Sequence, residues 1–207
     1  MQDNPLERVA GPLVRFVALL GGYAILGVAV FVSLEVVLRR AVGISLQGAD
    51  EFGGYALAGA AAFGFAYTLM LRGHTRIELV LERMPRRLAD LFDVIAMLAI
   101  AGMAVFLFWR GWAVMAESIE FRSLSGTPMR TPLWMPQAVW VAGLGLFALY
   151  AVLAAGHAVW LAATGHPGLR RWYGAKSLEE EIEEEKRSLI DRGAEPGDLS
   201  GRPEDRT

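Results

Sequence analysis

Glu35 and Arg39 are the charged residues of this sequence whose spacing best suits chemistry. They follow the charge-free stretch 16–34 and stand four residues apart, acidic residue first, so their side chains can meet on one helix face. An ionisable group at membrane depth can carry a proton or an ion, whereas the same pair at a helix end is an ordinary ion pair. Because both residues come after the apolar stretch, the sequence favours a helix-end ion pair.

The three histidines, His74, His157 and His166, would bind haem iron or a metal ion only if the fold brought them together. A haem anchor needs two imidazoles at matched depth on facing helices, and His74 and His157 leave that alternative open. The absence of cysteine excludes a disulfide framework, an iron–sulfur cluster, a thiolate zinc site and a cysteine nucleophile. We therefore expect no catalytic residue, no metal site and no cofactor, and hence no enzyme.

Long charge-free stretches show what kind of fold must hold these residues. The chain has 207 residues, 54% of them hydrophobic, and no Asp, Glu, Lys or Arg occurs in 16–34, 52–71, 94–109 or 131–169. About 20 apolar residues in a helix cross a hydrocarbon core of about 30 Å. The sequence thus predicts an all-α integral membrane protein with four transmembrane helices. The expected spans are about 12–38, 52–71, 90–112 and 136–164.

Charge divides the rest of the chain into segments. Residues 1–11 form a short polar N-terminus, and residues 12–176 form the membrane domain. Within it, residues 72–93 place apolar and charged side chains at helical spacing, which predicts a short amphipathic helix at the membrane surface. The composition of residues 177–207 predicts an acidic, partly disordered tail. No basic patch suits a nucleic acid, so we expect no nucleic-acid partner.

The distribution of Arg and Lys predicts the orientation in the membrane. Four spans place both termini on one side, and that side carries about twice as many Arg and Lys near the spans as the other. We therefore expect both termini, the 72–93 segment and the acidic tail in the cytoplasm. The segments 41–51 and 113–135 are then expected on the outer side.

The second expected span is rich in small residues, among them Gly53, Ala60 and Gly64. Small side chains let helices approach closely in lipid, where packing drives association. This helix is therefore expected either at the centre of a bundle or against a partner. Polar groups are scarce within the spans, whereas solute pathways usually use broken helices and polar groups at mid-depth. The pattern favours a scaffold or an accessory subunit.

Several segments, in this order, resemble a known family. Arg39-Arg40 precede a short linker and Asp50-Glu51, and the small-residue helix is followed by Arg-Gly-His-Thr-Arg-Ile-Glu at 72–78. A Ser-Gly-Thr-Pro run at 125–128 and a Pro-Leu-Trp-Met-Pro-Gln run at 132–137 precede the fourth span. Together these features resemble the DctQ-type small membrane subunit (Q subunit) of tripartite ATP-independent periplasmic (TRAP) transporters. The resemblance covers about residues 12–165.

The resemblance implies a function and a set of partners. TRAP systems are secondary transporters, usually coupled to sodium, that import organic acids across the bacterial inner membrane after a periplasmic substrate-binding protein captures them. The small subunit would be a non-catalytic scaffold for the large membrane subunit, which carries the coupling-ion sites, and would also contact phospholipids. An alternative is a small homodimeric proton-coupled exporter that uses Glu35 as its carrier.

The same resemblance suggests residues for the subunit interface. Arg39 and Glu51 would pair across the outer ends of the first two helices, and His74 and Arg76 would contact a partner or lipid headgroups at the inner surface. The complete set of candidates is Arg39, Glu51, Gly53, Ala60, Gly64, His74 and Arg76.

Overall fold

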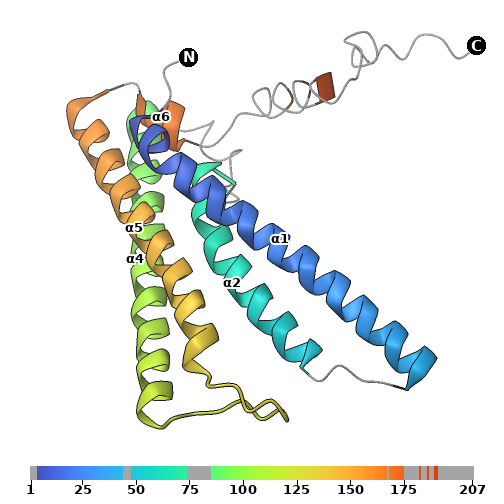
Figure 1. Ribbon diagram of the computed structural model, residues 1–207. Coiled ribbons are helices and arrows are strands. Elements are labelled where there is room, and N and C mark those ends of the chain that lie inside the picture. Colours follow the sequence, from blue (N-terminus) through green and yellow to red (C-terminus); the bar gives the residue numbers. More distant parts are fainter. Residues whose placement is uncertain are drawn as a thin grey trace, which may run out of the picture.

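The structure is a computed structural model that describes residues 4–43, 48–73, 85–166 and 168–174, with the single positions 182, 186, 189 and 190. The helices of the continuous ranges are α1 (Pro5–Val42), α2 (Ala49–Met70), α4 (Arg86–Glu120), α5 (Trp134–Thr164) and α6 (Gly168–Tyr173) (Figure 1). The first four are long and apolar enough to cross a membrane. The predicted all-helical fold with four spans is thereby confirmed. Between α4 and α5, Leu124 and Pro132 form an isolated β-bridge.

Helix α1 begins at Pro5, before the expected start of the first span at residue 12, and Pro12 lies inside the helix. The cause is local: the Asn4 side chain accepts a hydrogen bond from the Leu6 backbone N–H at 3.1 Å, and Pro5 occupies the first helical position. At the other end, Gly43 adopts a left-handed conformation with φ 74° and closes the helix. With 38 residues, α1 is about 57 Å long and exceeds the hydrocarbon core.

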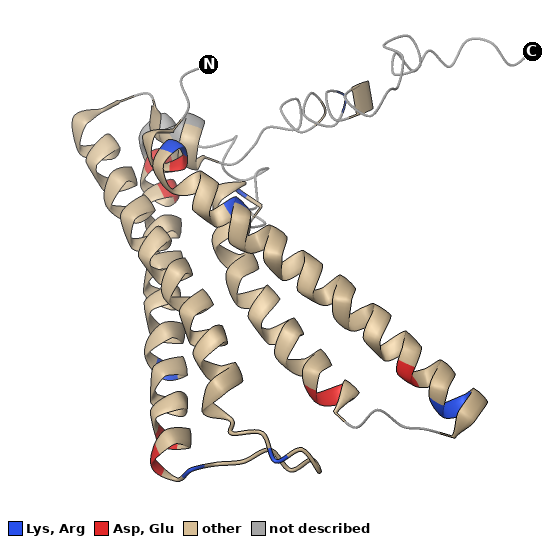
Figure 2. Cartoon of the chain, in the orientation of Figure 1, with Lys and Arg blue, Asp and Glu red and all other residues tan. Residues whose placement is uncertain are grey.

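Helix α4 also extends past its expected span. Its charge-free stretch ends before Arg110, yet the helix continues to Glu120, which adds about 15 Å. Charged residues lie toward the ends of the long helices and leave their central parts apolar (Figure 2). The last turns of α4 and the loop that follows, residues 121–133, therefore lie beyond the apolar segment.

The four long helices form a row rather than a closed bundle. Helix α1 packs on α2, α2 packs on α5, and α5 packs on α4 (Figure 1). Helix α1 makes few contacts with α5. Helix α5 is central and carries many of the buried side chains, whereas α1 and α4 form the two edges. Each edge helix keeps a broad apolar surface that the described residues do not cover.

Small residues determine how closely neighbouring helices approach. A Cβ atom added to Gly143 of α5 would lie 2.8 Å from the Ala62 Cβ and 3.0 Å from the Phe63 backbone nitrogen of α2. A Cβ on Gly21 of α1 would lie 3.2 Å from the Ala60 Cα. At both contacts the backbones meet directly, as expected for helices that associate in lipid through packing.

The α1–α2 pair diverges from the α4–α5 pair toward the end of the molecule where α2 begins (Figure 1). At the opposite end the pairs are held together, since Val14 and Ala66 are fully buried and α6 packs against α4 and α5. The amphipathic helix expected at 72–93 falls largely outside the described residues, because 74–84 are not described and 86–93 belong to α4.

Candidate functional site

Glu51, in the first turn of α2, joins this helix to the loop between α4 and α5. Its carboxylate accepts a hydrogen bond of 2.5 Å from the Tyr55 hydroxyl, one turn along the same helix. It also accepts a short hydrogen bond from the hydroxyl of Thr127, 76 residues away in sequence. The N-terminal end of a helix favours a negative charge, so the position suits an ionised carboxylate.

The loop that Glu51 contacts has its own hydrogen-bonded structure. Backbone hydrogen bonds join Ser125 N–H to the Thr131 carbonyl at 2.9 Å and Leu133 N–H to the Ser123 carbonyl at 3.0 Å. Because the Thr127 hydroxyl donates to Glu51, the Ser125 hydroxyl, 2.9 Å away, must donate to Thr127. Thr131 N–H in turn donates to the Ser125 Oγ at 3.0 Å. A continuous chain of hydrogen bonds thus runs through the loop and ends on Glu51.

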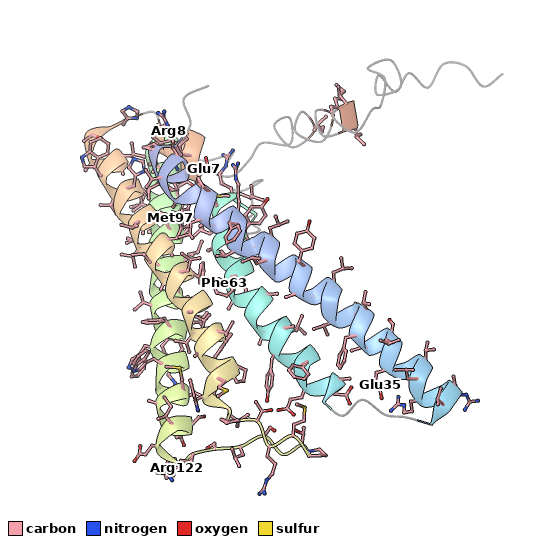
Figure 3. All side chains as sticks on the ribbon, viewed as in Figure 1. Glu7, Arg8, Glu35, Phe63, Met97 and Arg122 are labelled. Carbon is pink, nitrogen blue, oxygen red and sulfur yellow. The ribbon has the colours of Figure 1, made fainter. Side chains whose placement is uncertain are left out.

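A pocket of about 450 Å³ lies beside this loop, where α4 ends and α5 begins. Apolar atoms form most of its wall, and it is lined by Ile119, Arg122, Ser123, Leu124, Pro132 and Trp134. Arg122 marks the junction of α4 with the loop in Figure 3. Next to it the Phe121 side chain is 70% exposed, and Leu124 and Met129 are exposed as well. Exposed apolar side chains around an apolar pocket are typical of a surface that another molecule covers.

Glu35 and Arg39 form the helix-end ion pair that the sequence favours. The Arg39 Nε lies 3.7 Å from the Glu35 Oε1, and the side chains are 61% and 8% exposed respectively. Glu35 lies toward the C-terminal end of α1 (Figure 3). The predicted contact between Arg39 and Glu51 is wrong, because Glu51 bonds to Tyr55 and Thr127 while Arg39 pairs within its own helix.

The small residues of α2 have different surroundings. A Cβ on Gly53 would lie 3.7 Å from the Val28 Cγ1 of α1, and Ala60 contacts Gly21 of the same helix. Both therefore pack within this chain, against α1. A Cβ on Gly64 would meet no atom of the described residues within 4 Å. His74 and Arg76 lie outside the described residues.

Helix α1 presents the broadest apolar surface, because its buried residues are limited to Gly11, Val14 and Glu35. Tyr23 is 62% exposed and lies near the middle of the charge-free stretch 16–34. The residues that the structure describes offer its hydroxyl no hydrogen-bond partner. A polar group facing hydrocarbon without a partner is costly, so this side of α1 suits a protein surface better than lipid.

A cluster of aromatic and imidazole rings at the opposite end was not predicted. The Nδ1 of His157 and the hydroxyl of Tyr173 share a hydrogen bond of 2.8 Å. The His157 ring stacks on Trp160 and on Trp172, with ring centroids 6.0 and 5.6 Å apart. The contacts of His157 with Trp172 and Tyr173 fold α6 back onto α5. No sequence pattern marks them, because Gly165 ends α5 between the partners and reverses the chain.

Histidines and acids do not assemble into a metal site within the described ranges, where no group of three His, Asp or Glu side chains could hold an ion. The Nδ1 of His157 is engaged by Tyr173, and its suggested haem partner, His74, is outside these ranges.

Tyr173 is expected to titrate above the ordinary range of a tyrosine. Its side chain is 5% exposed, and this burial, with a smaller contribution from the charge of Glu7, raises its pKa to about 12 despite a hydrogen bond with Asn4. Docking of α6 should be fully stable below pH 10, the pKa of an undocked tyrosine, and should weaken as the pH rises from 10 toward 12.

The measurement is a phenolate absorbance titration of the full chain, compared with Tyr173→Phe. The difference between the two curves should be a transition centred near pH 12. A difference transition at pH 10 would contradict the buried position of Tyr173.

Comparison with known proteins places this architecture in a family. Residues 28–159 match the model of the family described as tripartite ATP-independent periplasmic transporters, DctQ component. No curated protein and no solved structure matches the chain. The match covers more than half of the sequence and includes α2, α4, most of α5 and the C-terminal part of α1. With four apolar helices of spanning length, this chain is a multi-pass membrane protein that belongs to the DctQ family of TRAP transporter components.

Proposed function

We propose that this chain is the scaffold that holds the large membrane subunit of a TRAP transporter in the bacterial inner membrane. The complete transporter would import organic acids delivered by a periplasmic binding protein, driven by an ion gradient whose sites lie on the large subunit. The termini would face the cytoplasm, and the loop 121–133 would face the periplasm. Family membership supports this role, and the distribution of Arg and Lys supports the orientation.

The exposed side of α1 is the observation that carries the proposal. Helix α1 is an edge of the row and packs almost entirely on α2, and the described residues offer no hydrogen-bond partner to the Tyr23 hydroxyl near the middle of the charge-free stretch 16–34. A large subunit packed on this side would bury apolar area and could supply a hydrogen-bond acceptor to Tyr23. Gly22 and Gly27 of α1 border open space, so a neighbouring helix could approach there closely.

The loop 121–133 is the surface proposed for the binding protein. It lies beyond the charge-free part of α4 and carries the exposed Phe121 beside the apolar pocket. Arg122 and Arg130 are exposed on the same loop and would add attraction for an acidic partner.

The alternative, a homodimeric exporter that uses Glu35 as a proton carrier, has less support. Glu35 follows the charge-free stretch, close to the end of α1, and its carboxylate is paired with Arg39. A carrier would need to exchange its proton with both sides of the membrane from a position nearer mid-depth.

Site-specific photocrosslinking in native membranes tests the scaffold proposal. A photoreactive amino acid at Tyr23 should give a crosslinked product that contains the large membrane subunit encoded with this chain. The matched position is Phe106, an exposed residue on α4 at the other edge of the row. Crosslinks to the large subunit from position 106 and none from position 23 would overturn the assignment of α1 as the contact helix.

A further inference from the structure

We infer that Glu51 is a clasp that holds the outer ends of the two helix pairs together. The outer ends are those where α1 and α4 end and where α2 and α5 begin. There the α1–α2 pair diverges from the α4–α5 pair, and the loop 121–133 extends from α4 toward the start of α2 (Figure 1). The hydrogen bond from Thr127 to Glu51 joins the two pairs across this divergence.

Direct helix contacts tie the pairs together elsewhere. Helices α2 and α5 touch where Gly59 approaches Val139 and where Gly143 meets Ala62, and the Phe65 and Phe147 rings lie 5.5 Å apart. Of these contacts, the one at Gly59 lies nearest the start of α2, two turns after Glu51. In the first two turns of α2, the Thr127 hydrogen bond to Glu51 connects the helix to the loop of the α4–α5 pair.

The clasp has a second contact that supports the same attachment. Met129 of the loop lies against Gly48, where an added Cβ would collide with the Met129 sulfur. Gly48 has φ +94°, a conformation that glycine adopts readily, and it provides the N-terminal cap of α2. The loop thus contacts the start of α2 through one polar group, Glu51, and one glycine that leaves room for a side chain.

Because of this chain of hydrogen bonds, the position of the loop depends on the Glu51 carboxylate. Thr131 N–H, the Ser125 hydroxyl and the Thr127 hydroxyl donate in sequence toward Glu51, and each bond polarises the next. Removing the carboxylate leaves the Thr127 and Tyr55 hydroxyls without their acceptor. The loop should then detach from α2, and the outer ends of the two pairs should separate more widely.

Distances between spin labels in the full chain test the clasp directly. The chain contains no cysteine, so labels can be attached to the exposed positions Val37→Cys on α1 and Ala116→Cys on α4. In lipid nanodiscs, Glu51→Ala should give a longer and broader distance distribution than the parent. Asp50→Ala is the matched control, because it removes the same charge from the neighbouring, exposed residue. A second label pair, Val37→Cys with Leu57→Cys, lies within the α1–α2 pair and should not change.

Cleavage of the loop provides an independent measurement. Arg130 is exposed and followed by Thr131, so trypsin can cut there once the loop opens. Loss of the hydrogen bond from Thr127 to the Glu51 carboxylate should raise the cleavage rate by about tenfold in Glu51→Ala. Equal distances and equal cleavage rates in Glu51→Ala and Asp50→Ala would overturn the proposal.

Thr127 keeps the test decisive if Glu51→Ala fails to fold. Thr127→Val removes the donor hydroxyl and leaves α2 unaltered, whereas Thr127→Ser retains the hydroxyl. The clasp predicts that the valine variant opens and that the serine variant matches the parent. A valine variant that matches the parent would refute it. These measurements use this chain alone. Their outcome therefore does not depend on which protein binds the loop.

Discussion

Replacing Gly143 by leucine is expected to separate α2 from α5 and to cause the largest loss of stability among the substitutions considered. A Cβ at this position would lie 2.8 Å from the Ala62 Cβ and 3.0 Å from the Phe63 backbone nitrogen, so the obstacle includes main-chain atoms that cannot rotate away. Overpacking a close contact typically costs up to about 3 kcal/mol. Because α2–α5 is the main contact between the two helix pairs, the whole row should loosen.

Thermal unfolding in detergent checks this prediction. After heating to each temperature, the fraction of the chain that still elutes as a single species is measured. Gly156 on the same helix is the matched control, since a Cβ there would meet nothing within 4 Å. Gly156→Leu should unfold near the temperature of the parent. If Gly143→Leu and Gly156→Leu unfold together, α2 and α5 do not meet at Gly143.

Gly21→Leu is expected to have the second-largest effect, by separating α1 from α2. A Cβ on Gly21 would lie 3.2 Å from the Ala60 Cα and 3.3 Å from its Cβ. The larger side chain should cost about 2 kcal/mol by forcing the two helices apart. The contacts of Gly53 with Val28 and of Phe31 with Phe52, whose ring centroids lie 6.3 Å apart, should be lost with it.

Gly22→Leu separates the packing effect from a change in helix propensity. Gly22 is the next residue of α1, and a Cβ there would meet nothing within 4 Å. Spin labels at Val37→Cys and Leu57→Cys should report a wider α1–α2 separation in Gly21→Leu but the parent distance in Gly22→Leu. A parent distance in both variants would show that α1 does not approach α2 at Gly21.

Both predictions depend on a feature of membrane helices that sequence patterns do not reveal. A helix of a soluble protein marks its inner face by the contrast between apolar and polar residues. Helices α2 and α5 are apolar around most of their circumference, so Gly143 and Gly156 look equivalent in the sequence. Their difference arises from shape, because one glycine meets a neighbouring backbone and the other meets open space.

The sequence alone determined the four spans, the ion pair of Glu35 with Arg39 and the family resemblance. Each depends on residues close together in the chain: about 20 apolar residues make a span, and a four-residue spacing makes a helical ion pair. The order of helices in the row, the bond from Thr127 to Glu51 and the bond between Tyr173 and His157 were decided by the tertiary structure.

The reason is that these contacts depend on partners brought together from different elements. Glu51 lies four residues from Tyr55, which a helical pattern could suggest, but 76 residues from Thr127, which only the return of the chain through α4 brings near. Arg39, closer in sequence and opposite in charge, looked the better partner. It pairs instead within α1, because Glu35 lies one turn away on the same helix face and needs no loop to bring it there.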